Sequence, residues 1–216
     1  MAIALVTTGG TIAMKERVKG EGAVPALTPQ DFLAELPPDF PPVIVEEHCN
    51  LPSSHFTLQT LWSLQERIRN LAAREDVEGI VITHGTDTME ETAYLLDITA
   101  PTDKPIVLTG AMRTAGEAGY DGMANLLAAL KVAFSPEARG RGAMIVMNDE
   151  VHAARYVTKS HTLSTATFVS PGWGPMGRID GDRVTFAWNI SRKVIPSTRL
   201  EEKVYLIKLG VGMGDE

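Results

Sequence analysis

Short apolar runs alternate with helix-like patterns along most of this chain. A strand buried on both faces of a parallel sheet reads as a continuous apolar run, whereas a surface helix repeats its apolar residues every three or four positions. The alternation predicts an α/β fold in which helices flank a mostly parallel, doubly wound, flavodoxin-like sheet. The apolar runs predicted as strands are residues 2–6, 43–47, 79–83, 105–109 and 143–147.

The first helices are marked by their ends and by their periodicity. Residues 29–36 are predicted to be helical because Thr28 is a suitable N-cap, Pro29 takes the first helical position, and two prolines follow at 37–38. Residues 58–73 carry large apolar side chains close to a 3.6-residue repeat. We expect that apolar face to pack into the core.

Two later helices and a hairpin complete the predicted fold. One helix starts near Thr88 and another near Asp121, whose carboxylate is placed to cap it. Beyond residue 147 the segments shorten. The stretch GRIDGDRVTFAW at 177–188 has two short runs on either side of an Asp-Gly turn, which predicts a C-terminal hairpin.

The end of the chain reads differently from the rest. Residues 1–190 are predicted to form the main domain, and the polar stretch 191–203 an interdomain linker. The apolar run that begins at Val204 predicts a further strand, with few residues after it to pack around. We therefore interpret 204–216 as the first strand of a smaller α/β domain that is truncated.

Composition and charge exclude several classes of partner. Of the 216 residues, 44% are hydrophobic and 22% charged, as in an ordinary globular protein. The net charge of -7 argues against a nucleic-acid surface, and the chain has no polybasic segment for a membrane. No basic segment leads into a long apolar stretch at the N-terminus, so we expect a cytoplasmic protein with no membrane span.

Cys49 is the single cysteine, so the chain forms no internal disulfide. We interpret it as a small apolar side chain. Its neighbour His48 makes a metal site conceivable, but the other histidines lack the spacing of metal ligands. We expect no metal and no cofactor.

Two polar turns follow apolar strands. The stretch TTGGTIA at 7–13 follows the first strand, and reads either as a tight turn with a polar lip or as a place that holds an anion or performs chemistry. The stretch GIVITHGTDTMEETAYLLD at 79–97 repeats that order of strand, polar turn and helix. Asp87 and Thr88 suit helix capping as well as function. Because parallel strands end at one edge of a sheet, both turns should open onto one crevice, which predicts a site.

These motifs resemble the bacterial-type L-asparaginase family, which includes the glutaminase-asparaginases. The resemblance implies hydrolysis of the side-chain amide of asparagine to aspartate and ammonia without metal or cofactor, by a homo-oligomer that is typically a dimer or tetramer. It covers most of the chain, through TGGTIA (8–13), HGTDTMEETAYLLD (84–97), PIVLTGAMR (105–113), DGMANL (121–126), VMNDEV (146–151) and VTKSHT (157–162).

The resemblance assigns the catalytic roles. Thr11 matches the nucleophilic threonine, Thr86 the second active-site threonine, and Lys159 the lysine that hydrogen-bonds to Thr86. Asp87 completes this group and can accept the α-ammonium of the substrate. A lysine acts as a base only when its neutral form is accessible, so we expect Lys159 to be buried beside Thr86.

Substrate contacts are assigned in the same way. Backbone N–H groups around Gly10 and Gly85 are candidates to stabilise the oxyanion. Ser54 matches the substrate-binding serine, but His55 follows it where the family often has glutamine, which leaves the α-carboxylate and α-amine contacts open. Ala111 lies in the loop where the family uses a backbone carbonyl near the leaving amide.

Two further departures from the family pattern matter more. Many members carry a tyrosine on the mobile loop after the nucleophile turn, whereas the corresponding residues 14–27 contain none, although Gly20 and Gly22 indicate a flexible lid. What replaces that hydroxyl stays open. In the family, the smaller domain of a neighbouring subunit completes the site, so we interpret this chain as an N-terminal domain that is a poor enzyme alone.

Two other functions remain as alternatives. Within the same resemblance, the asparaginase-like subunit of a tRNA-dependent amidotransferase releases ammonia from glutamine for a partner subunit. A non-catalytic amino-acid-binding domain would keep the pocket without turnover, although binding alone does not require a threonine–lysine pair. The sequence does not settle the choice between asparagine and glutamine, since one methylene is worth only about 1–3 kcal/mol in a pocket.

Overall fold

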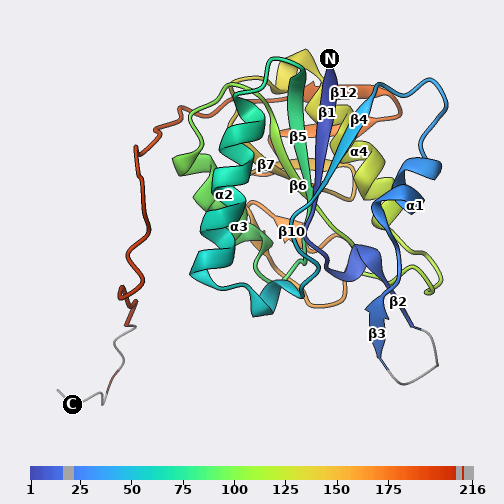
Figure 1. The fold of residues 1–216 in the computed structure, drawn as a ribbon, viewed down its shortest axis with the longest axis horizontal. Coiled ribbons are helices and arrows are strands. Elements are labelled where there is room, and N and C mark those ends of the chain that lie inside the picture. The colour runs from blue at the N-terminus through green and yellow to red at the C-terminus, as the bar shows by residue number, and fades with distance from the viewer. Residues whose placement is uncertain (17–21, 208–210, 212–216) are drawn as a thin grey trace.

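A computed structural model describes residues 1–16, 22–207 and 211, with an eight-stranded sheet at its centre and helices on both faces (Figure 1). The strand order is β12-β11-β8-β7-β6-β5-β1-β4. These strands are β1 (Ala2–Thr7), β4 (Val43–Glu47), β5 (Val77–Thr83), β6 (Ile106–Thr109), β7 (Ala143–Met147), β8 (Glu150–Ala153), β11 (Gly177–Asp180) and β12 (Arg183–Phe186). The helices are α1 (Pro29–Ala34), α2 (Leu58–Ala72), α3 (Met89–Thr99) and α4 (Gly122–Phe134), with 3-10 turns η1 (Thr11–Ala13), η2 (Ser53–His55) and η3 (Pro136–Ala138).

The parallel half of the sheet confirms the predicted doubly wound arrangement. Strands β4, β1, β5, β6 and β7 are all parallel, and they correspond to the five predicted apolar runs. The chain winds outward from β1 first to β4 and then, from β5, in the other direction. In such sheets the crevice for ligands lies beyond the carboxyl ends of the strands where this direction reverses. That place is the end of β1 and β5.

The other half of the sheet is antiparallel. Strand β7 returns as β8 through Asn148 and Asp149, which both have positive φ, 53° and 58°. Strands β11 and β12 form the predicted C-terminal hairpin, with Gly181 in the turn at φ 60°. Two small antiparallel sheets lie outside the main one, formed by β2 (Met14–Glu16) with β3 (Ala23–Pro25) and by β9 (Thr158–Lys159) with β10 (Phe168–Val169).

Each face of the sheet has its own apolar core. Helices α1 and α4 cover one face, and α2 and α3 the other (Figure 1). The predicted stripe on α2 is confirmed for Leu64, Ile68 and Leu71, which are buried, whereas Leu58 at the start of the helix is exposed. The β-strand residues between the two layers are buried on both sides, which explains their continuous apolar runs.

The helix ends agree only in part with the predictions. Thr28 caps α1 as expected, because its side chain accepts from the N–H of Asp31 in a capping box. The predicted cap by Asp121 is wrong: its carboxylate accepts from the N–H groups of Met112 and Arg113, and makes no capping bond to α4. Thr88 takes the N-cap position of α3, but its hydroxyl makes no capping bond either.

The last part of the chain runs along the outside of the fold, where Glu202 accepts from the side chain of Gln59 on α2. Arg192, within the predicted linker, is anchored by a hydrogen-bonded ion pair with the buried Asp97. Among the described residues, 204–207 of the strand predicted from Val204 are exposed and lie outside any strand. Whether they begin a strand of a further domain stays a prediction. Residues 208–210 and 212–216 of that prediction lie outside the described residues. The domain division itself stays a prediction.

The predicted lid is described only in part. Part of the predicted lid, residues 17–21 with Gly20, lies outside it, while the flanking strands β2 and β3 form a hairpin. Within the described ranges, no helix combines the length and apolar character needed to cross a bilayer.

Candidate functional site

The polar turns after β1 and β5 touch each other. Gly10, which has φ 87°, approaches so closely that a Cβ on it would lie 2.6 Å from the Cα of Gly85. A Cβ on Gly85 would in turn lie 2.7 Å from the Oγ of Ser53. Only glycine permits this approach, so these glycines bring three separate segments of the chain to one point.

The turn that carries Thr11 is a single 3-10 turn, η1. The N–H of Ala13 donates to the carbonyl of Gly10 at 3.0 Å, and the N–H of Met14 donates to the carbonyl of Thr11. Ile12 and Ala13 are buried, whereas Thr11 is partly exposed. The buried side chains of Ile12 and Ala13 therefore hold the turn in place, with Thr11 on the side that faces solvent.

Lys159 lies against the second turn, as expected, although it is partly rather than fully buried. Its Nζ donates to the Oγ1 of Thr86 at 2.9 Å and pairs with Oδ1 of Asp87 at 2.7 Å. The lysine side chain is 15% exposed and that of Asp87 is 67% exposed. The ammonium is thus shielded while the carboxylate remains open to a ligand.

Glu90, which sequence reasoning missed, holds the backbone of Lys159. Its carboxylate accepts from the N–H of Lys159 at 2.5 Å and from the hydroxyl of Thr158 at 3.2 Å. Because Glu90 stands in the first turn of α3, its charge is also favourable beside the helix N-terminus. The position of Glu90, three residues after Asp87 and one helical turn along, is the sequence feature that could have indicated its place in the site.

Among the described residues, it is Ser53 rather than Ser54 that hydrogen-bonds to the second turn. The N–H of Thr88 donates to the Oγ of Ser53 at 3.3 Å, and the hydroxyl of Thr88 donates to its carbonyl at 3.1 Å. Ser54 and His55 are exposed on η2 beside Ser53. In the described part of the chain, no hydrogen bond joins either of them to the threonines or to the lysine.

Ala111 is buried in the loop after β6, next to the same turn. Its neighbour Gly110 is so close that a Cβ there would lie 3.4 Å from Cγ2 of Thr86. The side chain of Asn125 donates to the carbonyl of Gly110 at 3.0 Å, which ties this loop to α4. The loop thus forms a wall beside Thr86.

His84 is buried directly before the second turn. Its Nδ1 lies 2.7 Å from the carbonyl of Gly85 and its Nε2 lies 3.0 Å from the hydroxyl of Thr92. Since a carbonyl only accepts, these partners assign the proton to Nδ1 of a neutral ring. Burial lowers the pKa of His84 to about 4, so the ring is neutral near pH 7.

His48 and Cys49 lie beside Thr7 and Thr8, at the start of the turn that carries Thr11. The thiol of Cys49 donates to the carbonyl of Thr8 at 3.4 Å, and partial burial raises its pKa. His48 lies 3.4 Å from the Oγ of Ser63. Among the residues that the structure describes, no three His, Cys, Asp or Glu side chains gather as a metal site would require.

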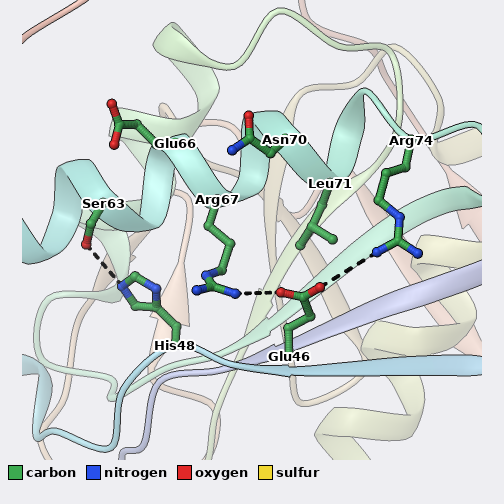
Figure 2. A pocket seen from close by; sticks show the side chains of 8 residues that line it. All are labelled: Glu46, His48, Ser63, Glu66, Arg67, Asn70, Leu71 and Arg74. Carbon is green, nitrogen blue, oxygen red and sulfur yellow. Dashed lines mark hydrogen bonds and ion pairs between the residues drawn. The ribbon is translucent and has the colours of Figure 1, made fainter.

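A cavity of about 580 Å³ lies between α2 and β4 and contains none of the predicted site residues (Figure 2). Glu46 pairs there with Arg67 at 2.5 Å and with Arg74 at 3.7 Å, so both guanidinium groups already have a carboxylate. A smaller cavity of about 270 Å³ adjoins the lysine contact instead. Its lining residues are Asp87, Glu90, Lys159, Ser160, His161 and Thr162.

Comparisons with known proteins agree on one family. The sequence model described as asparaginase, N-terminal, matches residues 2–192. L-asparaginase 2 of Bacillus subtilis (strain 168) is 42% identical over 197 residues, which is 88% of this chain and 52% of that protein. The glutaminase-asparaginase of Pseudomonas aeruginosa is 40% identical over 201 residues, covering 90% of this chain and 55% of its own length.

A solved structure gives the same result. The crystal structure of the probable cytoplasmic L-asparaginase from Campylobacter jejuni matches with a TM-score of 0.83 and 37% identity, over 88% of this chain and 59% of that one. The chain thus spans about half the length of the curated relatives that it matches.

Proposed function

Because the chain belongs to the asparaginase family, we propose that it carries the catalytic threonines of an amidohydrolase that converts L-asparagine to L-aspartate and ammonia. The observation that carries this proposal is the contact of Lys159 with Thr86 and Asp87, on a turn that touches the turn of Thr11. A binding protein needs an acceptor such as Asp87, but it has no need of a lysine on a threonine hydroxyl.

Thr11 acts as the nucleophile in this proposal. Its Oγ1 bonds to the side-chain amide carbon of the substrate while its proton is taken up, and the amide nitrogen leaves as ammonia after it gains a proton. An aspartyl ester remains on Thr11. Water then attacks the ester, which releases aspartate and returns the proton to Oγ1.

Lys159 and Thr86 move these protons. In its neutral form Lys159 draws a proton through the hydroxyl of Thr86, and the ammonium that results lies beside the carboxylate of Asp87. Asp87 has a second oxygen and is open to solvent, so it also accepts the α-ammonium of the substrate. One carboxylate then supports both the proton transfer and the recognition of an amino acid.

Backbone N–H groups stabilise the oxyanion. Within the described residues, the N–H groups of Gly10 and Gly85 do not donate to any backbone carbonyl. A well-placed donor of this kind contributes roughly 3 kcal/mol to the transition state. Ser54, His55 and Ala111 are the proposed substrate contacts around these glycines.

L-asparagine and L-glutamine are both candidate substrates. Relatives of similar identity are named L-asparaginase and glutaminase-asparaginase, so both amides belong in the assay. We propose asparagine as the preferred substrate and a homo-oligomer as the active form. Light scattering of the purified protein measures the latter.

The experiment measures ammonia release from L-asparagine and L-glutamine by two proteins. One is the 216-residue chain, and the other is a chimaera in which residues 2–192 replace the matching segment of the Bacillus subtilis relative. Thr11→Ala tests the nucleophile, and Thr185→Ala on the distant strand β12 is the matched control.

Each result has a definite meaning. Turnover of asparagine that Thr11→Ala abolishes, and that Thr185→Ala keeps, supports the proposal. Turnover by the chimaera alone means that the site needs a second half. A folded chimaera that binds asparagine without releasing ammonia supports the binding-domain alternative, and release from glutamine alone supports the amidotransferase alternative.

A further inference from the structure

The carbonyl groups of the turn that presents Thr11 are held by hydrogen bonds. The carbonyls of Gly10 and Thr11 accept from the N–H groups of Ala13 and Met14, and the carbonyl of Ala13 accepts from two N–H groups that follow β3. All of these donors are backbone groups. The carbonyl of Ile12, the residue after Thr11, is instead held by a side chain.

That side chain is Tyr120. Its hydroxyl donates to the carbonyl of Ile12 at 2.7 Å, across 108 positions of sequence. The ring packs against one of the two apolar cores, next to α4. Burial raises the pKa of Tyr120 above that of a free phenol, so the hydroxyl stays protonated and keeps its role as donor across the working range of pH.

The loop that carries Tyr120 is braced at both ends. The carboxylate of Asp121 accepts from the backbone of Met112 at 3.1 Å and of Arg113 at 3.0 Å, which closes the loop at its base. The N–H of Ala115 donates to the carbonyl of Met14 at 2.9 Å, which attaches the loop to the far end of the nucleophile turn. The loop and the turn therefore form one braced unit.

Gly122 leaves the space in which the ring of Tyr120 lies. A Cβ at this position, the first of α4, would collide with the ring and with the hydroxyl oxygen of Tyr120. Since Gly122 has no positive φ, the contact with the ring is the feature that requires glycine. This gives an independent way to displace Tyr120 without removing it.

We propose that Tyr120 is a positioning residue, which fixes the direction of the Thr11 hydroxyl through its hydrogen bond to the carbonyl of Ile12. The proposal rests on the proposed role of Thr11 as nucleophile. Tyr120 need not touch the substrate. A small displacement of a nucleophile lowers the rate because the attack requires a narrow range of distance and angle.

Two variants test this, with Tyr94→Phe on the exposed side of α3 as the matched control. Tyr120→Phe removes only the hydroxyl, and Gly122→Ala displaces the ring. Amide hydrogen exchange of residues 10–16 in the chain reports on the turn without requiring turnover. The kcat and KM for asparagine are measured on whichever form releases ammonia, the chain or the chimaera.

We expect both variants to speed exchange in residues 10–16 and to lower kcat roughly tenfold with KM nearly unchanged, while Tyr94→Phe does neither. Faster exchange with an unchanged kcat makes Tyr120 purely structural and overturns the proposal, as does unchanged exchange. If the unsubstituted proteins release no ammonia, the proposed function fails. The exchange result then shows separately whether Tyr120 braces the turn.

Discussion

Gly10 and Gly85 lie so close that a Cβ on Gly10 would stand 2.6 Å from the Cα of Gly85. This approach joins the turn of Thr11, after β1, to the turn of Thr86, after β5. The site therefore depends on glycine at positions 10 and 85, where a side chain would force the turns apart, as much as on the reactive hydroxyl groups.

Gly10→Ala should separate the two turns. An alanine at this position would have a strained positive φ, and its Cβ would collide with the backbone of Gly85. We therefore expect the rate of ammonia release to fall by about a hundredfold or more, and the free energy of unfolding to fall as well. Gly140→Ala separates the two causes, because Gly140 has φ 76° and nothing within 4 Å of its Cβ position. Equal losses of activity in the two variants would show that the contact with Gly85 is unimportant.

Lys159→Met should abolish most turnover while it preserves the length of the side chain. Loss of the group that moves the proton lowers kcat by about a hundredfold to ten-thousandfold in general acid–base catalysis. Lys131→Met is the control, since Lys131 also pairs with a carboxylate, Asp182 at 2.7 Å, but on the far side of the fold. Steady-state kinetics that do not distinguish the two variants would remove Lys159 from the mechanism.

Glu90 should act through the backbone of Lys159. Glu90→Gln keeps an oxygen that can accept from this N–H, whereas Glu90→Ala leaves the N–H without its partner. We expect Glu90→Ala to lower kcat about tenfold and Glu90→Gln to restore much of the loss. Glu91→Ala is the neighbouring exposed control. Equal kcat values for Glu90→Ala and Glu91→Ala would contradict the role of Glu90.

His84 should make the fold less stable in acid. Its folded pKa of about 4 lies below the ordinary 6.5, so between these values the unfolded chain binds a proton that the folded chain does not. As pH falls from about 7.5 to 5, this costs about 2 kcal/mol of stability. Urea unfolding should show a smaller pH dependence for His84→Gln. An imidazole of His84 that titrates near 6.5 by NMR would contradict this prediction.

The sequence predicts the arrangement of the parallel strands well, because burial on both faces leaves an unmistakable apolar run in each of them. It also places Thr11 and Thr86 at one edge of the sheet, since topology alone brings the ends of β1 and β5 together. Residues 204–207 carry the same apolar signal, yet among the described residues they lie outside any strand, because a strand needs a neighbour that a local pattern cannot supply.

The supporting contacts of the site join residues that lie far apart in the sequence, so no local pattern predicts them. Asp121 looks like a helix cap in sequence, but three-dimensional packing directs its carboxylate to the loop before it. Tyr120 reaches Ile12 across 108 positions, and Glu90 reaches the backbone of Lys159 across 69. Such partners leave no periodic trace, because each depends on how separate elements pack.

The most direct test of the account is to identify which threonine carries the acyl group. Lys159 contacts Thr86, whereas the nucleophile is proposed to be Thr11, so the two hydroxyls must be distinguished. The protein that releases ammonia is mixed with L-asparagine, quenched in acid within the first turnovers, digested and mapped by mass spectrometry. We predict an aspartyl ester on Thr11 that Thr11→Ala removes. An ester on Thr86, with Thr11 unmodified, would contradict the central claim.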